Sequence, residues 1–262
     1  MLLVVDVGNT NSVFAVHDGA GFVADWRCAT DVKRTADQYF VWLNQLLAHV
    51  GVTPKDVDGV VISATAAGTL FNLRVLSAKY FDRRPVVVGK PETRLPVPPR
   101  VEPGTRVGAD RLANAVAAFE TYGGDVVVVD FGTATNFDVV APDGAYVGGV
   151  IAPGVNLSLK ALEDAATALP EIDVTKPESV IGANTVACMQ SGIYWGYVGL
   201  VEGLLARLRE EIGRPLKVVA TGGLSPLFAR GTEVFDHVDP DLTLRGLVSI
   251  HELNAREHAL EP

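Results

Sequence analysis

Apolar positions in the first part of the chain form short runs, then amphipathic stretches. Three strand-like runs separated by turn residues come first, at 2–7, 12–17 and 22–28. Helical periodicity follows at 36–50, where Thr35 is placed to cap the helix and Gln38 to complete a capping box. The pattern then predicts a buried strand, a helix and another strand, at 57–63, 70–80 and 85–88.

The second part of the chain repeats this order of elements. A helix, three strands, two helices, a strand and a last helix are expected at 109–122, 126–131, 136–141, 146–151, 156–168, 184–212, 216–220 and 243–254. Residues repeat as well, because 3–10 (LVVDVGNT) aligns with 127–134 (VVVDFGTA). We therefore expect an α/β protein with two duplicated halves, 1–108 and 109–262, and a nucleotide cleft between them.

Composition and charge exclude several classes of protein. With a net charge of −9, a pI near 5.0 and no basic stripe, neither nucleic acid nor an anionic membrane is an expected partner. No apolar run reaches the roughly 18 residues that span a bilayer. The first ten residues are typical of a buried strand, not a signal peptide. Two cysteines far apart, Cys28 and Cys188, favour a reducing cytoplasm.

One motif that occurs twice has residues suited to binding or catalysis. It is an Asp-x-Gly turn at the end of a strand. Asp6 and Asp130 each stand where a carboxylate can hold Mg²⁺ or its waters, and the glycine that follows lets phosphate approach the backbone. The conformation of the backbone is enough to explain one such turn. Two matching turns indicate that the protein binds a polyphosphate between them. A third strand ends in Gly222-Gly223, which fits either a strand-to-helix turn or close approach to adenine.

Asp110 and Arg111 follow a long loop (90–106) that contains five prolines and no periodicity. An aspartate at a helix start is often only a cap. A carboxylate there can also accept the proton of an attacking hydroxyl in phosphoryl transfer, while the arginine holds an anionic group. The local sequence leaves both readings open.

Seven motifs in order make the chain resemble the type III pantothenate kinases of the actin/sugar-kinase/Hsp70-like superfamily. They are DVGNT (6–10), GADR (108–111), DFGTA (130–134), GGVIAPG (148–154), IGANT (181–185), TGG (221–223) and LTLRGL (242–247). The resemblance runs from residue 2 to about 254. It implies two actin-like (ribonuclease H-like) halves and the ATP-dependent phosphorylation of pantothenate to 4′-phosphopantothenate, the first step of coenzyme A biosynthesis.

The resemblance also implies roles for individual residues. ATP would be bound by Asp6, Val7, Gly8, Asn9, Thr10, Asn11, Ser12, Val13 and Thr133. Pantothenate would be bound by Gly108, Ala109, Asp110, Arg111 and Thr185. Asp110 would be the catalytic base, and Asp130 would lie at a monovalent cation, K⁺ or NH₄⁺. Thr185 would reach the substrate from the neighbouring subunit of a homodimer, and near-repeated glycines in the helix 184–212 favour close packing of that helix.

Three positions depart from the family pattern. Val101 stands where a substrate-contacting tyrosine is usual, Asn136 where a threonine is common and Ala15 where a glycine is common. Two alternatives to a pantothenate kinase therefore stay open. One is a nucleotide-binding regulator or scaffold without turnover, and the other is a kinase for a different hydroxyl compound.

Overall fold

A computed structural model describes residues 1–166 and 168–258, which form two compact units. The first unit contains Met1–Ala117 and the segment that starts at Leu242, and the second contains Ala118–Asp241. This division differs from the predicted halves 1–108 and 109–262. Residues 167 and 259–262, which belong to the predicted helix 156–168 and the predicted second half, lie outside the described residues.

The first unit is built on a five-stranded mixed sheet in the order β3-β2-β1-β4-β5. Its strands are β1 (Leu2–Val7), β2 (Asn11–His17), β3 (Phe22–Ala29), β4 (Gly59–Ala64) and β5 (Val86–Val87). β1, β2 and β3 form an antiparallel meander, and β4 and β5 run parallel to β1. All of β1 except Asp6 is buried, as expected for an apolar strand covered on both faces.

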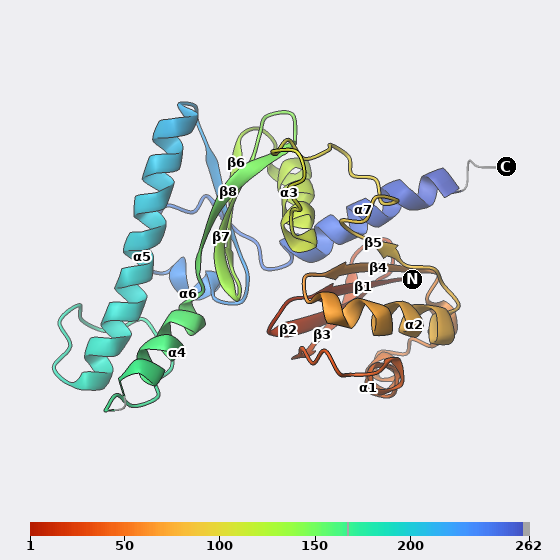
Figure 1. The fold of residues 1–262 in the computed structure, drawn as a ribbon, viewed down its shortest axis with the longest axis horizontal. Coiled ribbons are helices and arrows are strands. Elements are labelled where there is room, and N and C mark those ends of the chain that lie inside the picture. The colour runs from red at the N-terminus through yellow and green to blue at the C-terminus, as the bar shows by residue number, and fades with distance from the viewer. Residues whose placement is uncertain (167, 259–262) are drawn as a thin grey trace. The chain divides into compact units, whose positions relative to one another are not determined.

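Helices cover both faces of this sheet (Figure 1). α1 (Ala36–His49) and α2 (Leu70–Phe81) pack into one hydrophobic cluster with β1, β2 and β4. α7 (Leu242–His258) and the start of α3 (Ala109–Tyr122) pack into the cluster on the other side. Four buried residues of α7 pack with Leu2 and Val4 of β1, namely Leu244, Leu247, Val248 and Ile250. The last helix therefore completes the core of the first unit.

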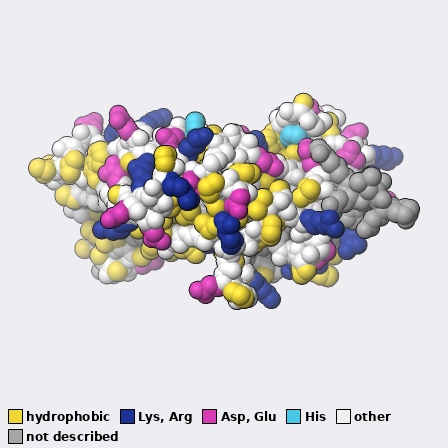
Figure 2. Space-filling model, turned by 90° about the horizontal axis from the view of Figure 1, so that it is seen from above, with side chains coloured by type: hydrophobic (Ala, Val, Ile, Leu, Met, Phe, Trp, Pro, Cys, Tyr) yellow, Lys and Arg dark blue, Asp and Glu magenta, His cyan; other side chains and the backbone are white. Residues whose placement is uncertain are grey.

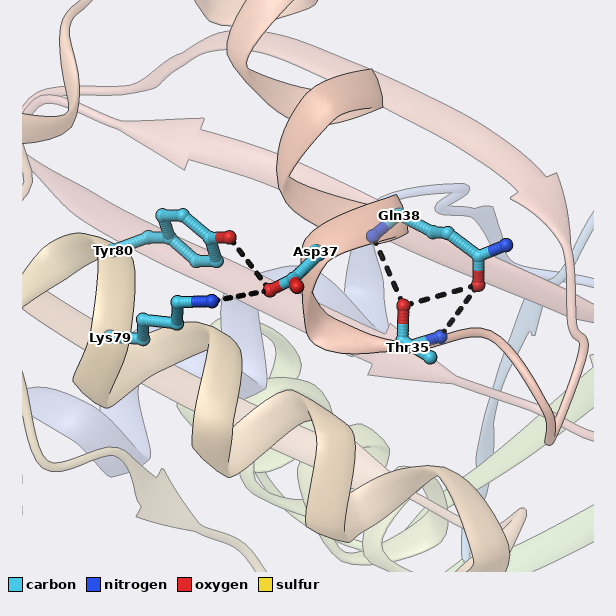
Figure 3. Close-up of polar contacts among 5 residues, drawn as sticks. All are labelled: Thr35, Asp37, Gln38, Lys79 and Tyr80. Atoms are coloured by element: carbon cyan, nitrogen blue, oxygen red, sulfur yellow. Dashed lines mark hydrogen bonds and ion pairs between the residues drawn. The ribbon is translucent and has the colours of Figure 1, made fainter.

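The start of α1 confirms the predicted capping box (Figure 3). The backbone N–H of Gln38 donates to the Thr35 hydroxyl, and the Gln38 side chain accepts from the Thr35 backbone N–H at 2.9 Å. In the same turn, Asp37 accepts hydrogen bonds from Lys79 and Tyr80 of α2 at 2.8 and 2.7 Å. These contacts fix the first turn of α1 and tie it to α2.

The second unit repeats this sheet. Its strands are β6 (Val126–Phe131), β7 (Ala134–Val140), β8 (Tyr146–Pro153), β9 (Lys217–Thr221) and β10 (His237–Val238), in the order β10-β9-β6-β7-β8. β6, β7 and β8 again form an antiparallel meander, and β9 and β10 again run parallel to the central strand. The predicted α/β fold with two similarly built halves is confirmed.

The described residues of the second unit include the helices α4 (Val155–Ala165), α5 (Thr185–Ile212) and α6 (Ser225–Phe228). α5 has 28 residues and packs one face against β6, β7 and β9 (Figure 1). Its buried face carries Tyr194, Tyr197, Val198, Val201 and Leu205. The side chains of Tyr194 and Tyr197 are therefore part of the core of the second unit.

The sequence missed only short elements. These are β10, α6 and two 3₁₀ turns, Pro54–Asp56 and Ala67–Thr69. The predicted helix 156–168 ends earlier, at Ala165. In the described part of the chain, no helix is both long and apolar enough to cross a membrane.

Candidate active site

The first Asp-Gly turn lies where β1 meets β2. Asp6 is paired with Val13 of β2 and Ser63 of β4. The backbone N–H of Gly8 closes the turn by donating to the carbonyl of Asn11 at 2.9 Å, and the side chains at 9–11 are exposed. The turn thus presents polar side chains and backbone at the edge of the sheet where β1 ends.

Two threonines that the sequence did not single out hold this turn. The Thr30 hydroxyl donates to the carbonyl of Gly8 at 2.8 Å and lies 2.8 Å from the hydroxyl of the buried Ser12. Thr65 donates both its backbone N–H and its hydroxyl to the carbonyl of Val7, at 2.9 and 3.1 Å. Each threonine directly follows a strand parallel to β1, so each reaches the edge where β1 ends. That position is the signal by which sequence could have found them.

Asp110 occupies the second position of α3, not its cap. The first helical hydrogen bond runs from the N–H of Leu112 to the carbonyl of Gly108 at 3.1 Å. The carboxylate of Asp110 accepts from the backbone N–H of Arg111 at 2.9 Å and folds over Gly108, where a Cβ would lie 2.5 Å from Oδ1. The buried Ala109 packs in the same cluster as β1.

The charge state of Asp110 results from opposing effects. Burial raises the pKa of its carboxyl above the ordinary value, although the hydrogen bond from Arg111 and the positive charge of Arg111 both lower it. A raised pKa brings a carboxylate closer to the range in which it serves as a general base. Asp110 is thus not the N-cap of α3, and its role as a catalytic base stays a prediction.

The long loop before α3 is held to α7 at Arg94. The side-chain amide of Asn254 accepts from the backbone N–H of Arg94 and donates to its carbonyl, both at 3.0 Å. Val101 lies half-buried further along the same loop. α7 therefore supports both the sheet and the segment that leads into Gly108.

The second Asp-Gly turn, in the second unit, is one residue shorter. Here the backbone N–H of Gly132 donates to the carbonyl of Ala134 at 3.0 Å, and the exposed Thr133 lies between them. Asp130 is paired with Asn136 on β7 and with the buried Thr221 on β9. The predicted alignment of the two segments therefore holds along β1 and β6, but it shifts by one residue in the loops that follow these strands.

Two glycines let neighbouring backbone approach this turn. Gly222 has a left-handed φ of 86°, and a Cβ there would lie 2.6 Å from Asp130 Oδ1 and 2.7 Å from the carbonyl oxygen of Phe131. Gly154, the cap of α4, has its Cα directly against the carbonyl oxygen of Thr133. The glycines of two family-like motifs thus pack on the same turn.

Thr185 is the first residue of α5 and is exposed. Asn184 caps the helix by accepting from the backbone N–H of Ala187 at 2.9 Å. The preceding residues fold back onto the helix, because Gly182 lies against the backbone of Ala187 and Cys188 and its carbonyl accepts from the Cys188 thiol at 3.2 Å. This fold leaves Ile181 with 86% of its surface exposed.

Oxygen atoms suited to hard cations lie beside both aspartates. In the first unit, the buried hydroxyl of Ser63, paired with Asp6, has no hydrogen-bond partner among the described residues. In the second, the buried Asn136 Oδ1, paired with Asp130, likewise has none within the described residues. Carboxylate, amide and hydroxyl oxygens are ligands of Mg²⁺ and other hard cations, so these residues fit the implied ions.

Attraction of phosphate has to come from local groups. The net charge is −9, and Figure 2 shows acidic and basic side chains interspersed on the face it presents. Exposed turn backbone and the guanidinium of Arg111 are groups of the kind that can attract anions over the few ångströms at which salt does not screen them.

Comparison with known proteins identifies the family. The family model described as type III pantothenate kinase matches residues 2–207. A curated type III pantothenate kinase from Cereibacter sphaeroides is 61% identical over 254 residues, which cover 97% of this chain and 98% of that protein. The chain belongs to the type III pantothenate kinase family. Membership of the type III pantothenate kinases accounts for the order of the motifs, including those around Asp6, Asp110 and Asp130.

More distant solved structures share the fold of this type III pantothenate kinase family member. A protein assigned as a 2-dehydro-3-deoxygalactonokinase from Sinorhizobium meliloti aligns with a TM-score of 0.62 at 16% identity, over 97% of this chain and 96% of that chain. A ROK hexokinase from Thermus thermophilus aligns with a TM-score of 0.50 at 16% identity, over 98% of this chain and 99% of that chain. At these identities the likeness concerns the fold alone.

Proposed function

We propose that this chain transfers the γ-phosphoryl group of ATP to the hydroxyl group of pantothenate and so makes 4′-phosphopantothenate for coenzyme A biosynthesis in the cytoplasm. The observation that carries the proposal is 61% identity over nearly the whole chain to a type III pantothenate kinase. The residues with the required chemistry, Asp6, Asp110, Arg111 and Asp130, are all present.

Asp110 is the proposed general base. Its carboxylate would accept the proton of the pantothenate hydroxyl as that oxygen attacks the γ-phosphorus atom. Burial raises the pKa of Asp110, which strengthens it as a proton acceptor. Arg111 would hold the pantothenate carboxylate, and Gly108 and Ala109 would line the same site at the N-terminus of α3, which favours anions.

The two turns are the proposed ATP-binding elements. In the first, Asp6 through Val13 would hold phosphate oxygens with backbone N–H groups and hydroxyls, and in the second Thr133 would do so. Asp6 would hold Mg²⁺ and Asp130 would hold K⁺ or NH₄⁺. Bound there, these ions would neutralise charge on the phosphates.

A homodimer completes the proposal. Gly192, Gly196 and Gly199 lie four and three positions apart on α5, and a Cβ at any of them would meet nothing within 4 Å in the described chain. Such a glycine face lets a second helix pack closely. With Ile181 exposed nearby in sequence, this face is suited to a second copy, which would bring its Thr185 to the pantothenate site.

A phosphoryl-transfer assay tests the function. The purified chain is given ATP, Mg²⁺ and K⁺ with pantothenate or with one of several other polyols, and the product is identified by mass spectrometry. We expect 4′-phosphopantothenate as the main product. Preferred phosphorylation of another polyol would support a different kinase despite the family, and ATP binding without any transfer would support a regulator.

A further inference from the structure

The buried hydroxyl of Tyr197 lies at the centre of a hydrogen-bond network inside the second unit. Tyr197 is on α5 and has 7% of its surface exposed. Its hydroxyl lies 3.0 Å from the carbonyl oxygens of both Pro153 and Gly154, and 2.6 Å from the hydroxyl of Ser158. Because a phenol has one proton and carbonyl oxygens only accept, Tyr197 donates to the two carbonyls and accepts a hydrogen bond from the Ser158 hydroxyl.

This network reaches the second Asp-Gly turn through Gly154. The Cα of Gly154 contacts the carbonyl oxygen of Thr133, and a Cβ at Gly154 would also lie 2.8 Å from the carbonyl oxygen of Gly132. No side chain fits between the two backbone segments. Whatever holds the Pro153–Gly154 backbone therefore limits where Thr133 can lie.

A ring contact joins the same helix to the other side of the turn. Phe131, which directly precedes Gly132, stacks on Phe228 with ring centroids 4.9 Å apart. The ring of Phe228 lies 6.2 Å from that of Tyr197 and 5.3 Å from that of Tyr194. The rings of α5 thus support the strand end, whereas the hydroxyl of Tyr197 supports the loop.

Tyr194 provides a comparison for Tyr197, because its ring packs in the same core while its hydroxyl has a different partner. It is also buried on α5 and packs on Phe228, but its hydroxyl makes a longer bond, 3.3 Å, to the carbonyl of Leu227 and none to the 153–154 backbone. The two tyrosines therefore share packing and differ in what the hydroxyl holds.

We infer that Tyr197 is a positioning residue for ATP binding, which acts by holding the Pro153–Gly154 backbone against Thr133. The inference rests on the proposed contact of Thr133 with ATP phosphate. The inference gives α5 a second role beside packing. The helix carries Thr185 at its start, and its middle would hold the second Asp-Gly turn in place.

Two matched substitutions separate this task from packing. Tyr197→Phe keeps the ring and removes the hydroxyl, and Tyr194→Phe does the same one turn earlier. We expect Tyr197→Phe to raise the dissociation constant of ATP, measured by titration calorimetry, and the KM for ATP by roughly 2- to 10-fold, the usual range for one hydrogen bond. The KM for pantothenate should stay near that of the unchanged protein, and Tyr194→Phe should alter neither ATP constant. Ser158→Ala, a second variant, should weaken ATP binding in the same direction.

Different results would contradict different claims. Unchanged ATP affinity in folded Tyr197→Phe, or equal losses in both Tyr→Phe variants, would overturn the inference. So would a full Tyr197→Phe effect in a Thr133→Ala background, because the route through Thr133 predicts a smaller one. If the unchanged protein bound ATP but did not phosphorylate pantothenate, the proposed function would fail. The comparison of ATP affinities would still decide the inference.

Discussion

The carboxylate of Asp110 accepts a 2.9 Å hydrogen bond from the backbone N–H of Arg111, in the first turn of α3. This bond and the charge of Arg111 favour the ionised carboxylate, yet burial outweighs them and raises its pKa. The protein thus holds a partly desolvated carboxylate at the start of α3, as the proposed general base requires.

Replacing Asp110 by Asn tests the base directly. Asn keeps the shape but accepts no proton, so kcat should fall about 10²- to 10⁴-fold, which corresponds to about 3–5 kcal/mol of barrier. ATP affinity, measured by calorimetry, should remain near that of the unchanged protein. A folded Asp110→Asn variant with near-normal turnover would leave Asp110 no role in catalysis.

The raised pKa of Asp110 also predicts two pH dependences. For activity, kcat/KM should rise with pH through the raised pKa, so its acidic limb should lie above the ordinary aspartate value of about 3.9. For stability, a carboxyl whose folded pKa exceeds its unfolded pKa loses stability as pH rises from the ordinary value through the raised one. Asp110→Asn should remove this loss, so its free energy of unfolding near neutral pH should match or exceed that of the unchanged protein. Denaturant titrations at several pH values measure it, and a lower value for Asp110→Asn at neutral pH would speak against the raised pKa.

Removal of K⁺ and NH₄⁺ tests the cation at Asp130. In a buffer with Na⁺ as the only monovalent metal ion, activity should be much lower than in K⁺, and the KM for ATP should rise because phosphate charge is less neutralised. Asp130→Asn should be slow in both buffers. Equal rates of the unchanged protein with and without K⁺ would remove this role from Asp130.

Gly154→Ala tests the close contact with the second turn. Gly154 has φ −73° and ψ 156°, which alanine adopts without strain, so any effect comes from the methyl group meeting Thr133. We expect a loss of about 1–3 kcal/mol in the free energy of unfolding, typical of overpacking, and a higher KM for ATP. Gly21→Ala is the control, because a Cβ there meets nothing within 4 Å. An unaltered ATP constant in Gly154→Ala would show that the contact does not matter for ATP.

Gly196→Gln tests the proposed dimer. The position is exposed on α5, so glutamine should fit one chain and favour the helix, whereas a second copy packed there would be pushed away. Sedimentation should show more monomer, and activity should fall with it because Thr185 would no longer reach the neighbouring site. Glu211→Gln, at the exposed far end of α5, should change neither. A fully active monomer of the unchanged protein would contradict the shared site.

Much of the fold could be predicted because its signals are local. β1, β6 and α3 have the predicted bounds, since apolar runs and helical periodicity report directly on burial. The two-residue strand β10 lacks such a pattern. The place of α7 in the first unit could not be read either, because it depends on contacts with Leu2 and Val4 far away in sequence.

The sequence singled out candidate residues with unusual signals and passed over residues with ordinary signals. The Asp-Gly turns stand out because they occur twice. Thr30, Thr65 and Tyr197 act through hydrogen bonds to backbone carbonyls, and nothing in their immediate neighbours marks such bonds. The order of the strands in the sheet explains why the two threonines lie at the first turn. The contacts of Tyr197 with residues 153, 154 and 158 can be recognised only from atomic positions.

The return of α7 to the first unit has a consequence for synthesis on the ribosome. Residues 118–241 are contiguous, so the second unit emerges whole while the first still lacks the helix that covers one face of its sheet. The apolar surface at Leu2 and Val4 then stays exposed until α7 has been made, and such exposed surface favours aggregation. A nascent chain stalled just before Leu242 should therefore protect the later-made unit from protease better than the earlier-made one.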